Sequence, residues 1–273
     1  MEAAERLSLE AFAKEIRIAT IESIANLGVG HIGGAMSIVD LLALLYGRVL
    51  RVDPARPTWE GRDRLVLSKG HAGPALYSAL AIKGFFPREW LATLNKGGTR
   101  LPSHCDRLKT PGIDMRTGSL GQGISAACGM AKALQIDSSA SRVFCIIGDG
   151  ESDEGQVWES AQFAAHHRLG NLVVFTDSNR LQIDGYTDDV MGLGDLEAKW
   201  AAFGWYAQRA PGHDVEAIDA AITKAVVEAR GRPSMIVLDT IKGKGCSFCE
   251  GDPANHNMNI SAEQARAAIA ALA

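Results

Sequence analysis

The chain contains 273 residues, of which 47% are hydrophobic and 22% charged, an ordinary composition for a globular protein. Its formal net charge of −4 argues against a nucleic-acid-binding surface, and no stretch approaches the roughly 18–20 uninterrupted apolar residues of a membrane span. Glu2, Glu5 and Arg6 precede any apolar run, so the N-terminus does not resemble a signal peptide. We expect a single domain over residues 1–273, with no nucleic-acid or membrane partner.

Helices and a glycine-rich loop are predicted at the start of the chain. Apolar residues at spacings of three and four predict a helix over 8–26, with Ser8 as its N-cap and Gly28 beyond its end. The run 28–34 is so rich in glycine that we expect neither a helix nor a paired strand there. Three further elements follow: a largely buried helix over 37–46, a strand over 63–68 and a helix over 74–83.

The middle of the chain holds an aperiodic segment. Residues 97–118 are rich in glycine, proline and charge, and a structureless stretch of about 20 residues inside a compact domain is more often functional than idle. It ends in Gly118, Ser119 and Leu120, which lead into a helix predicted over 124–134. Backbone amides at such a glycine-rich helix start are natural binders of anions.

Strands and helices alternate through the rest of the chain. The predicted strands cover 143–150, 171–179, 204–208 and 235–239, and the predicted helices cover 157–169, 196–203, 215–229 and 262–273. Residues 181–185 are expected to form a turn. This alternation predicts a doubly wound α/β fold, with a mostly parallel sheet and helices on both faces.

Two polar residues follow neighbouring predicted strands. Asp149 and Asn179 end the strands on either side of the helix over 157–169, which makes one βαβ unit with parallel strands. Both should therefore lie at the carboxyl edge of the sheet, where open α/β sheets bind ligands. Carboxylate and amide oxygens suit Mg²⁺ or Ca²⁺, and the flanking glycines let a phosphate approach the backbone. The sequence thus predicts a metal-bridged diphosphate at this edge.

Four histidines are predicted to lie in loops at strand or helix ends. A single loop histidine is usually just solvated or hydrogen-bonded, but four in such places favour a site, because imidazoles handle protons and anionic oxygens near neutral pH. The adjacent pair His166 and His167 falls within a predicted helix and is interpreted as structural or exposed. The four loop histidines are His31, His71, His104 and His256.

Five cysteines, an odd number without framework spacing, favour reduced thiols in a cytoplasmic protein. Cys246 and Cys249 form a C-x-x-C pattern. A structural zinc site needs a second close pair of ligands, and the sequence supplies none. We interpret the pattern as incidental.

Several motifs together resemble the transketolase family, in the family's order and over nearly the whole chain. They are Gly30-His-Ile-Gly-Gly34, Leu67-Ser-Lys-Gly-His-Ala72, Thr117-Gly-Ser-Leu-Gly-Gln-Gly123, Gly148-Asp-Gly150 through Asn179, and Gly212-His-Asp214. The fourth motif resembles the thiamine-diphosphate signature. Synthases of the deoxyxylulose-phosphate type share the first and fourth motifs, but the Leu67–Ala72 motif resembles the transketolase form.

The resemblance implies a thiamine diphosphate-binding fold, with thiamine diphosphate and Mg²⁺ (or Ca²⁺) as cofactors. Asp149 and Asn179 match the family's metal ligands, with the backbone carbonyl of Leu181 as a third. The positions that match further cofactor contacts are Gly118, Ser119, Leu120 and Gly150.

The same resemblance implies roles for the histidines. His71 and His256 match residues near the diphosphate, and His31 and His104 match residues that hold donor hydroxyls. Glu154 matches the acidic residue that links paired active sites across a subunit interface.

Some positions depart from the family pattern. Asn257 follows His256 where glycine is usual, and Ser178 stands where an acidic or amide residue is usual. The resemblance covers only the N-terminal half of the family, and the family's activating glutamate belongs to a second, pyrimidine-binding domain. The chain therefore resembles the N-terminal subunit of a split transketolase. The implied partner is a separate C-terminal subunit, and the resemblance also implies self-association across a two-fold axis.

The implied activity is transfer of a two-carbon ketol unit from a ketose, expected to be a sugar phosphate, to an aldose. One alternative is a related thiamine synthase, of the deoxyxylulose-phosphate type or acting on a branched or sulfonated sugar. Another is a non-catalytic paralogue that kept the fold. A dinucleotide-binding domain is disfavoured, because no G-x-G-x-x-G opens a first βα turn.

Overall fold

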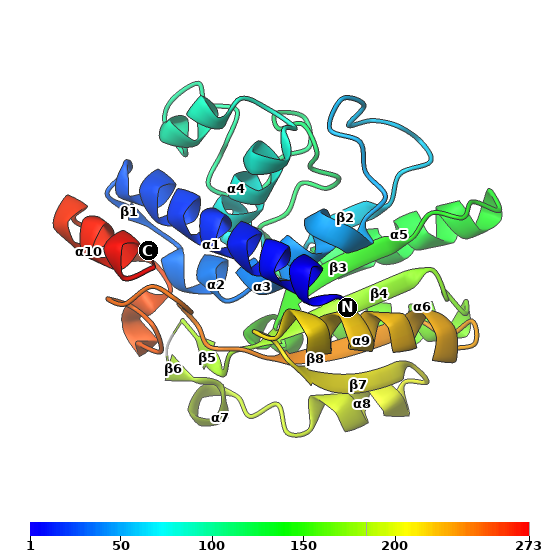
Figure 1. Cartoon of the computed structure of the whole chain (residues 1–273). Helices are drawn as coiled ribbons and strands as arrows, with labels where there is room; N and C mark the ends of the chain where they lie inside the picture. Colours follow the sequence, from blue (N-terminus) through cyan, green and yellow to red (C-terminus); the bar gives the residue numbers. More distant parts are fainter. Residues whose placement is uncertain (184, 273) are drawn as a thin grey trace.

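The computed structural model describes residues 1–183 and 185–272. Its centre is a five-stranded sheet in which all neighbouring strands are parallel (Figure 1). The strands, in spatial order, are β2 (Arg64–Leu67), β3 (Val143–Gly148), β4 (Leu172–Ser178), β8 (Ser234–Asp239) and β7 (Tyr206–Pro211). The predicted doubly wound parallel α/β fold is confirmed.

The strands are buried on both faces. All seven residues of β4 are buried, so the strand is continuously apolar up to its polar end rather than alternating. Alternate side chains enter two separate cores: Phe144 and Ile146 pack on one side of the sheet, and Cys145 and Ile147 on the other. Helices must therefore cover both faces.

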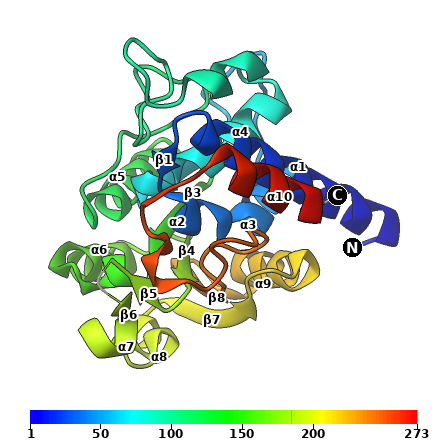
Figure 2. The same ribbon diagram turned by 90° about the vertical axis from the view of Figure 1, so that its left-hand side faces the viewer.

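The helices form two layers, which Figure 2 separates on either side of β3 and β4. One layer consists of α5 (Gln122–Ile136), α6 (Gly155–His166) and α8 (Leu196–Ala202). The other consists of α2 (Ile32–Met36), α3 (Val39–Leu44), α4 (Gly73–Lys83) and α9 (Val215–Glu228), with α1 (Ala3–Ala25) packed on α3 and α4 and α10 (Ala262–Leu272) on α1.

The shorter elements connect this framework. They are β1 (Val29–Gly30), β9 (Met258–Asn259), β5 (Leu181–Gln182), β6 (Gly185–Tyr186), α7 (Thr187–Val190), the π-helical turn η1 (Leu45–Val49) and the 3₁₀ turns η2 (Gly70–Ala72), η3 (Arg88–Thr93), η4 (Gly150–Asp153) and η5 (Pro253–Asn255). Residues 97–118 contain no helix or strand, as predicted. The turn predicted over 181–185 is the β5–β6 hairpin, in which Asp184 lies outside the described residues.

The first helix starts earlier than predicted. Ser8 lies inside α1, which begins at Ala3 with Glu2 as its N-cap. The preceding residues are good helix formers, and Arg6 pairs with Glu10 one turn later, so the helix extends past the predicted cap.

The expectation of an unpaired loop over 28–34 is wrong. Val29 and Gly30 pair antiparallel with β9, and α2 begins at Ile32. A Cβ added at Gly33 would collide with Asn255, so the glycine serves a close approach between chain segments rather than loop flexibility. The partner strand lies far along the chain, where no local pattern indicates it.

Other boundaries shift by a few residues. The helix predicted over 37–46 is divided between α3 and η1. The strand predicted over 204–208 runs instead as β7 from Tyr206 to Pro211, because Gly204 has a left-handed φ of 88° and pairing with β8 carries the strand further. The helix predicted over 262–273 is observed as α10 up to Leu272, and Ala273 lies outside the described residues.

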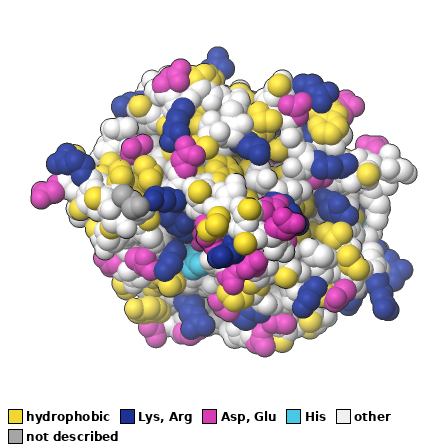
Figure 3. All heavy atoms as spheres, in the orientation of Figure 1, with side chains coloured by type: hydrophobic (Ala, Val, Ile, Leu, Met, Phe, Trp, Pro, Cys, Tyr) yellow, Lys and Arg dark blue, Asp and Glu magenta, His cyan; other side chains and the backbone are white. Residues whose placement is uncertain are grey.

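On the face seen in Figure 3, acidic and basic side chains are interspersed, and neither sign forms a continuous patch. None of the helices in the described part of the chain is both long and apolar enough to cross a membrane.

Candidate active site

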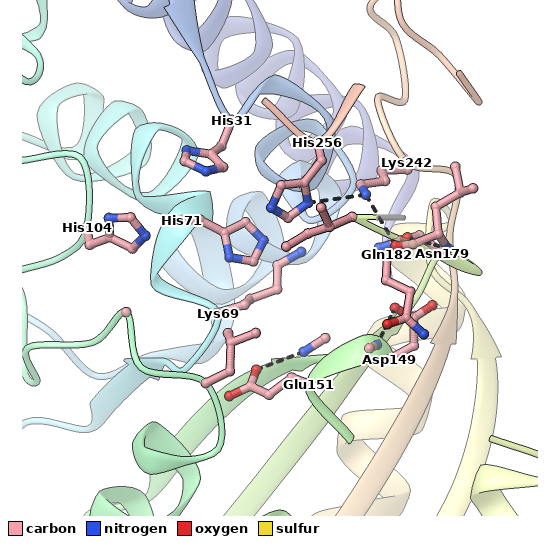
Figure 4. A pocket seen from close by; sticks show the side chains of 17 residues that line it. His31, Lys69, His71, His104, Asp149, Glu151, Asn179, Gln182, Lys242 and His256 are labelled. Carbon is pink, nitrogen blue, oxygen red and sulfur yellow. Dashed lines mark hydrogen bonds between the residues drawn. The ribbon is translucent and has the colours of Figure 1, made fainter. Parts of the chain in front are cut away.

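A cavity of about 350 Å³ opens at the carboxyl edge of the sheet (Figure 4). Its walls come from the ends of β2, β3, β4 and β8 and from three loops. The residues that line it include all four predicted histidines together with Gly34, Lys69, Gly118, Leu120, Gly148, Asp149, Gly150, Glu151, Asn179, Leu181, Gln182, Ile183 and Lys242. The structure therefore brings together nearly every site residue predicted from the sequence.

Asp149 lies at the end of β3 with 3% of its surface exposed. One carboxylate oxygen accepts the N–H of Gly150 at 2.8 Å and the other accepts the N–H of Arg180 at 2.5 Å. Burial, reinforced by the charge of Asp177, raises the pKa of Asp149 to about 7. A buried carboxylate destabilised in this way is stabilised by a cation placed on its free lone pairs.

Asn179 follows β4, and its orientation is set by Asp177. The Asn179 amide nitrogen donates to Asp177 at 2.8 Å, and its oxygen accepts the N–H of Leu181 at 3.1 Å. Asp177 is fully buried and ion-paired with Lys69. Burial acts to raise the pKa of Asp177, but the charge and hydrogen bond of Lys69, together with the hydrogen bonds of Ser37 and Thr240, hold that pKa below its ordinary value.

Sequence reasoning missed Asp177 and Lys69. A signal was present, because each is a charged residue close to the end of a predicted strand and two positions before a predicted site residue. The pair ties the end of β4 to the segment after β2.

Leu181 presents its backbone carbonyl to the same space. That oxygen accepts a hydrogen bond from Lys242 Nζ at 3.2 Å. Burial, and then the charge of Lys69, lowers the pKa of Lys242 to about 8. Since a carbonyl oxygen has two acceptor positions, one remains for a cation.

The donor set fits a hard divalent cation. Asp149, Asn179 and Leu181 contribute a carboxylate, an amide oxygen and a carbonyl oxygen, the ligand types of Mg²⁺ and Ca²⁺. Within the described residues there is no group of three or more His, Cys, Asp or Glu side chains arranged for a metal, so a site of the zinc type finds no support there. We call these three residues and Asp177 the oxygen wall.

The four histidines form one cluster on the other side of the cavity, which we call the histidine wall (Figure 4). The ring of His31 lies 5.5 Å from that of His71, 5.6 Å from that of His104 and 5.3 Å from that of His256, measured between centroids. They come from the loop before α2, the turn η2, the aperiodic segment and the chain after η5. The tertiary structure thus joins residues up to 225 positions apart (256 − 31).

All four imidazoles have a lowered pKa. Burial is the largest cause for each, and for His256 the charge of Lys242 adds to it and places the pKa at about 4. The imidazoles are therefore neutral at pH 7, and each can donate through one nitrogen and accept through the other.

The glycine-rich segments approach the cavity closely. Gly118 has φ of 147°, and a Cβ there would lie 3.2 Å from His104. At Gly150 a Cβ would lie 3.1 Å from Gln182. Ser119 lines a shallower pocket that also includes His104, rather than the main cavity.

Glu154 lies outside the cavity. It is the exposed residue that precedes α6 and makes no capping hydrogen bond. All five cysteines are buried and free, including the C-x-x-C pair.

The chain matches the family described as "Transketolase, thiamine diphosphate binding domain" over residues 8–272. It belongs to the transketolase family. A relative from Clostridium sp. (strain MSTE9), "6-deoxy-6-sulfo-D-fructose transketolase subunit SqwG", is 56% identical over 98% of this chain and 97% of its own length. An apulose-4-phosphate transketolase subunit of Actinobacillus succinogenes is 38% identical over 91% of this chain and 90% of its own.

Solved structures of the family have the same fold as this chain. The transketolase from Leishmania mexicana superposes with a TM-score of 0.91 at 30% identity, covering 97% of this chain and 41% of that one. The chain therefore spans less than half of that longer transketolase, whereas it matches nearly the full length of the two relatives named as subunits.

Proposed function

We propose that this chain is the cofactor-binding subunit of a two-chain transketolase that acts on a modified ketose. The observation that carries the proposal is the placement of the oxygen wall opposite four neutral histidines around one cavity. A diphosphate needs the cation that the oxygen wall would hold. A polyhydroxylated sugar needs the hydrogen-bonding groups of the histidine wall. The relatives of matching length, both named as transketolase subunits, support the two-chain arrangement.

In this proposal Asp149, Asn179 and the carbonyl of Leu181 would hold Mg²⁺ (or Ca²⁺), whose charge would make the site receptive to the diphosphate of thiamine diphosphate. Gly118, Leu120 and Gly150 offer backbone close to the phosphates, with Ser119 beside them. Bound thiamine diphosphate supplies the carbon that takes up and releases the two-carbon ketol unit.

The histidine wall handles the sugar. His31 and His104 would hold hydroxyl groups of the donor, since a neutral imidazole can donate to one oxygen and accept from another. His71 and His256, with ring centroids 5.0 Å apart, lie on the side of the cluster next to Lys69 and Lys242 (Figure 4) and would stabilise charge near the diphosphate and move protons at the reacting oxygens.

The substrate is a modified ketose in this proposal because the relative that is 56% identical is named for a sulfonated fructose, and the next for apulose 4-phosphate. The partner is a separate chain with the pyrimidine-binding domain. Two such pairs would associate through the surface that carries Glu154, giving a heterotetramer. The motif Ser68-Lys-Gly-His71 favours this assignment over a deoxyxylulose-phosphate synthase.

The test is reconstitution. The purified chain is expected to show no ketol transfer, and the addition of a partner recovered by pull-down from the native source, with thiamine diphosphate and Mg²⁺, is expected to restore it. Sulfonated, phosphorylated and unmodified ketoses are then compared as donors. Robust activity of the isolated chain would sink the two-chain arrangement, and equal kcat/KM for all donors would remove the modified-sugar assignment.

A further inference from the structure

Glu151 is a buried carboxylate to which the proposed function gives no role. It lies in η4, directly after β3, with 2% of its surface exposed, and its side chain borders the cavity (Figure 4). One carboxylate oxygen accepts the hydroxyl of Ser68 and the N–H of Gly121, the latter at 2.9 Å. The other accepts the N–H of Gly148 at 3.0 Å.

The three donors belong to three separate segments of the cavity wall. Ser68 lies between β2 and Lys69, Gly121 closes the glycine-rich segment before α5, and Gly148 ends β3 next to Asp149. Glu151 therefore connects the segment that presents Gly118 and Leu120 with the segment that presents Asp149 and Gly150.

A carboxyl group with two acceptor oxygens satisfies all three donors at once. A hydroxyl and two amides all present hydrogens, and Asp and Glu are the side chains that offer two acceptor oxygens and no donor. Without Glu151, the N–H groups of Gly121 and Gly148 would lose their partner inside the protein, which is costly for buried backbone.

The local packing leaves this contact little freedom. Gly121 has a left-handed φ of 80°, and a Cβ at Gly123 would collide with Ser68. The start of α5 therefore rests directly on the end of β2, and Glu151 reaches both from the neighbouring strand.

We propose that Glu151 is a positioning residue that holds the two glycine-rich segments at the spacing that receives the diphosphate, before the cofactor binds. The inference rests on the proposed function for the identity of the ligand. Glu151 acts through the backbone of these segments, and its own oxygens are already occupied by protein donors.

The first test is Glu151→Gln in the full chain. Glutamine keeps the size and one acceptor oxygen of Glu151, but its amide nitrogen carries two hydrogens. Depending on the orientation of the amide, these hydrogens would point at the N–H of Gly148 or at the donors Ser68 and Gly121. Calorimetric titration with thiamine diphosphate and Mg²⁺ should show about 10- to 100-fold weaker binding, the usual size of an outer-shell effect. Glu159→Gln, an exposed site on α6 with the same charge change, is the control and should bind like the wild type.

Hydrogen exchange of the cofactor-free chain gives the second readout. In Glu151→Gln, the amides of Gly148 and Gly121 should lose protection while those in the middle of β4 keep theirs. A general loss of stability would instead accelerate exchange throughout the sheet. In the reconstituted enzyme, the thiamine diphosphate concentration for half activity should rise while the KM of the sugar stays unchanged.

Equal thiamine diphosphate affinity of the wild type and Glu151→Gln would overturn the inference and leave the proposed function intact. If the wild type binds no thiamine diphosphate even when its partner chain is present, the proposed function fails. Unchanged protection at Gly148 in Glu151→Gln would overturn the positioning role. If Glu151→Gln does not fold, Ser68→Ala decides: it removes one of the three donors, and unaltered cofactor affinity in that variant would contradict the proposal.

Discussion

The two walls of the cavity are held in place by different kinds of contact. On the oxygen wall, the carboxylate of Asp177 accepts hydrogen bonds from four side chains, those of Lys69, Ser37, Asn179 and Thr240. Both oxygens of Asp149 accept hydrogen bonds from backbone N–H groups. Each acceptor there has a fixed direction before any ligand arrives. The histidine wall is held by ring contacts and by a hydrogen bond of 3.4 Å between Lys242 and His256.

This difference indicates a division of labour. A dense hydrogen-bonded network preorganises a binding surface and contributes to stability, so changes there should reduce cofactor affinity or folding. Loosely bonded neutral imidazoles keep free donors and acceptors for a substrate, so changes at His31 or His104, the two histidines assigned to the sugar, should reduce turnover and spare the cofactor. The predictions below test this contrast, starting from the largest expected effect.

Asp149→Ala should abolish binding of thiamine diphosphate in the presence of Mg²⁺, because it removes the charged ligand from the oxygen wall. We expect a loss of about 100-fold or more, and chelation of the metal should do the same to the wild type. Calorimetric titration measures both. Asp137→Asn, at the exposed end of α5, is the control, and unchanged affinity of Asp149→Ala would refute the assigned ligand.

Asp177→Asn should lower the free energy of unfolding by about 3–5 kcal/mol, since it leaves the buried Lys69 cation unpaired. Urea denaturation measures the change. Asp239→Asn breaks the exposed pair with Arg209 and should cost less than about 1 kcal/mol. Recovery of stability in the double variant Asp177→Leu, Lys69→Met would identify the unpaired charge as the cause. A small effect of Asp177→Asn would contradict the claim that the hydrogen-bonded network of the oxygen wall stabilises the fold.

His104→Ala should lower kcat of the reconstituted enzyme by about 100-fold, at the lower end of the range for a positioned proton-handling or hydrogen-bonding group. Thiamine diphosphate affinity should change less than about threefold, because His104 lies on the histidine wall away from the oxygen ligands. Steady-state kinetics and titration give the two values. A parallel loss of cofactor affinity would contradict the division of labour.

The smallest expected effect is a pH dependence of the cofactor-free chain. The pKa of His256 is lowered to about 4 by burial and by its neighbours Lys242, His31 and Lys69, with His71 beside it. At His256 the unfolded chain therefore binds more protons than the folded chain between pH 6.5 and about 4, and the contribution of this group to stability falls as the pH falls through this window, whereas the raised pKa of Asp149 acts in the opposite direction. The lowered pKa values of the other three imidazoles act in the same direction as that of His256.

The change in thermal midpoint from pH 7 to pH 5 should therefore be more negative in the wild type than in His256→Asn, which lacks this imidazole. Equal changes in the two chains would show that His256 titrates as it does in the unfolded chain.

Local patterns predicted the sheet and its functional edge well. The buried strands carry continuous apolar runs that stop at Asp149 and Asn179, and parallel βαβ topology then leaves one place where both can lie. Four of the five strands of the sheet and most helices could be placed this way to within a few residues, because their burial follows directly from the order of apolar side chains.

Contacts between distant segments were not predictable. The pairing of β1 with β9 joins Val29 to Asn259, and the run 28–34 therefore carries no local sign of a strand. Glu151 lies among Ser152, Asp153 and Glu154 in the sequence, where an acidic residue is normally exposed. Its burial depends on donors from two other segments.

The sequence by itself determined the α/β class and the polar residues that follow the apolar strands. It also determined which residue types are available for a diphosphate and a divalent cation, because each of these depends on periodicity and on short motifs. The tertiary structure alone decided which of those residues share a cavity and how each is held. Lys69 and Asp177, and likewise Glu151 and Gly121, meet only after the strands pair, since a buried charge is stable only where folding brings its partners within hydrogen-bond distance.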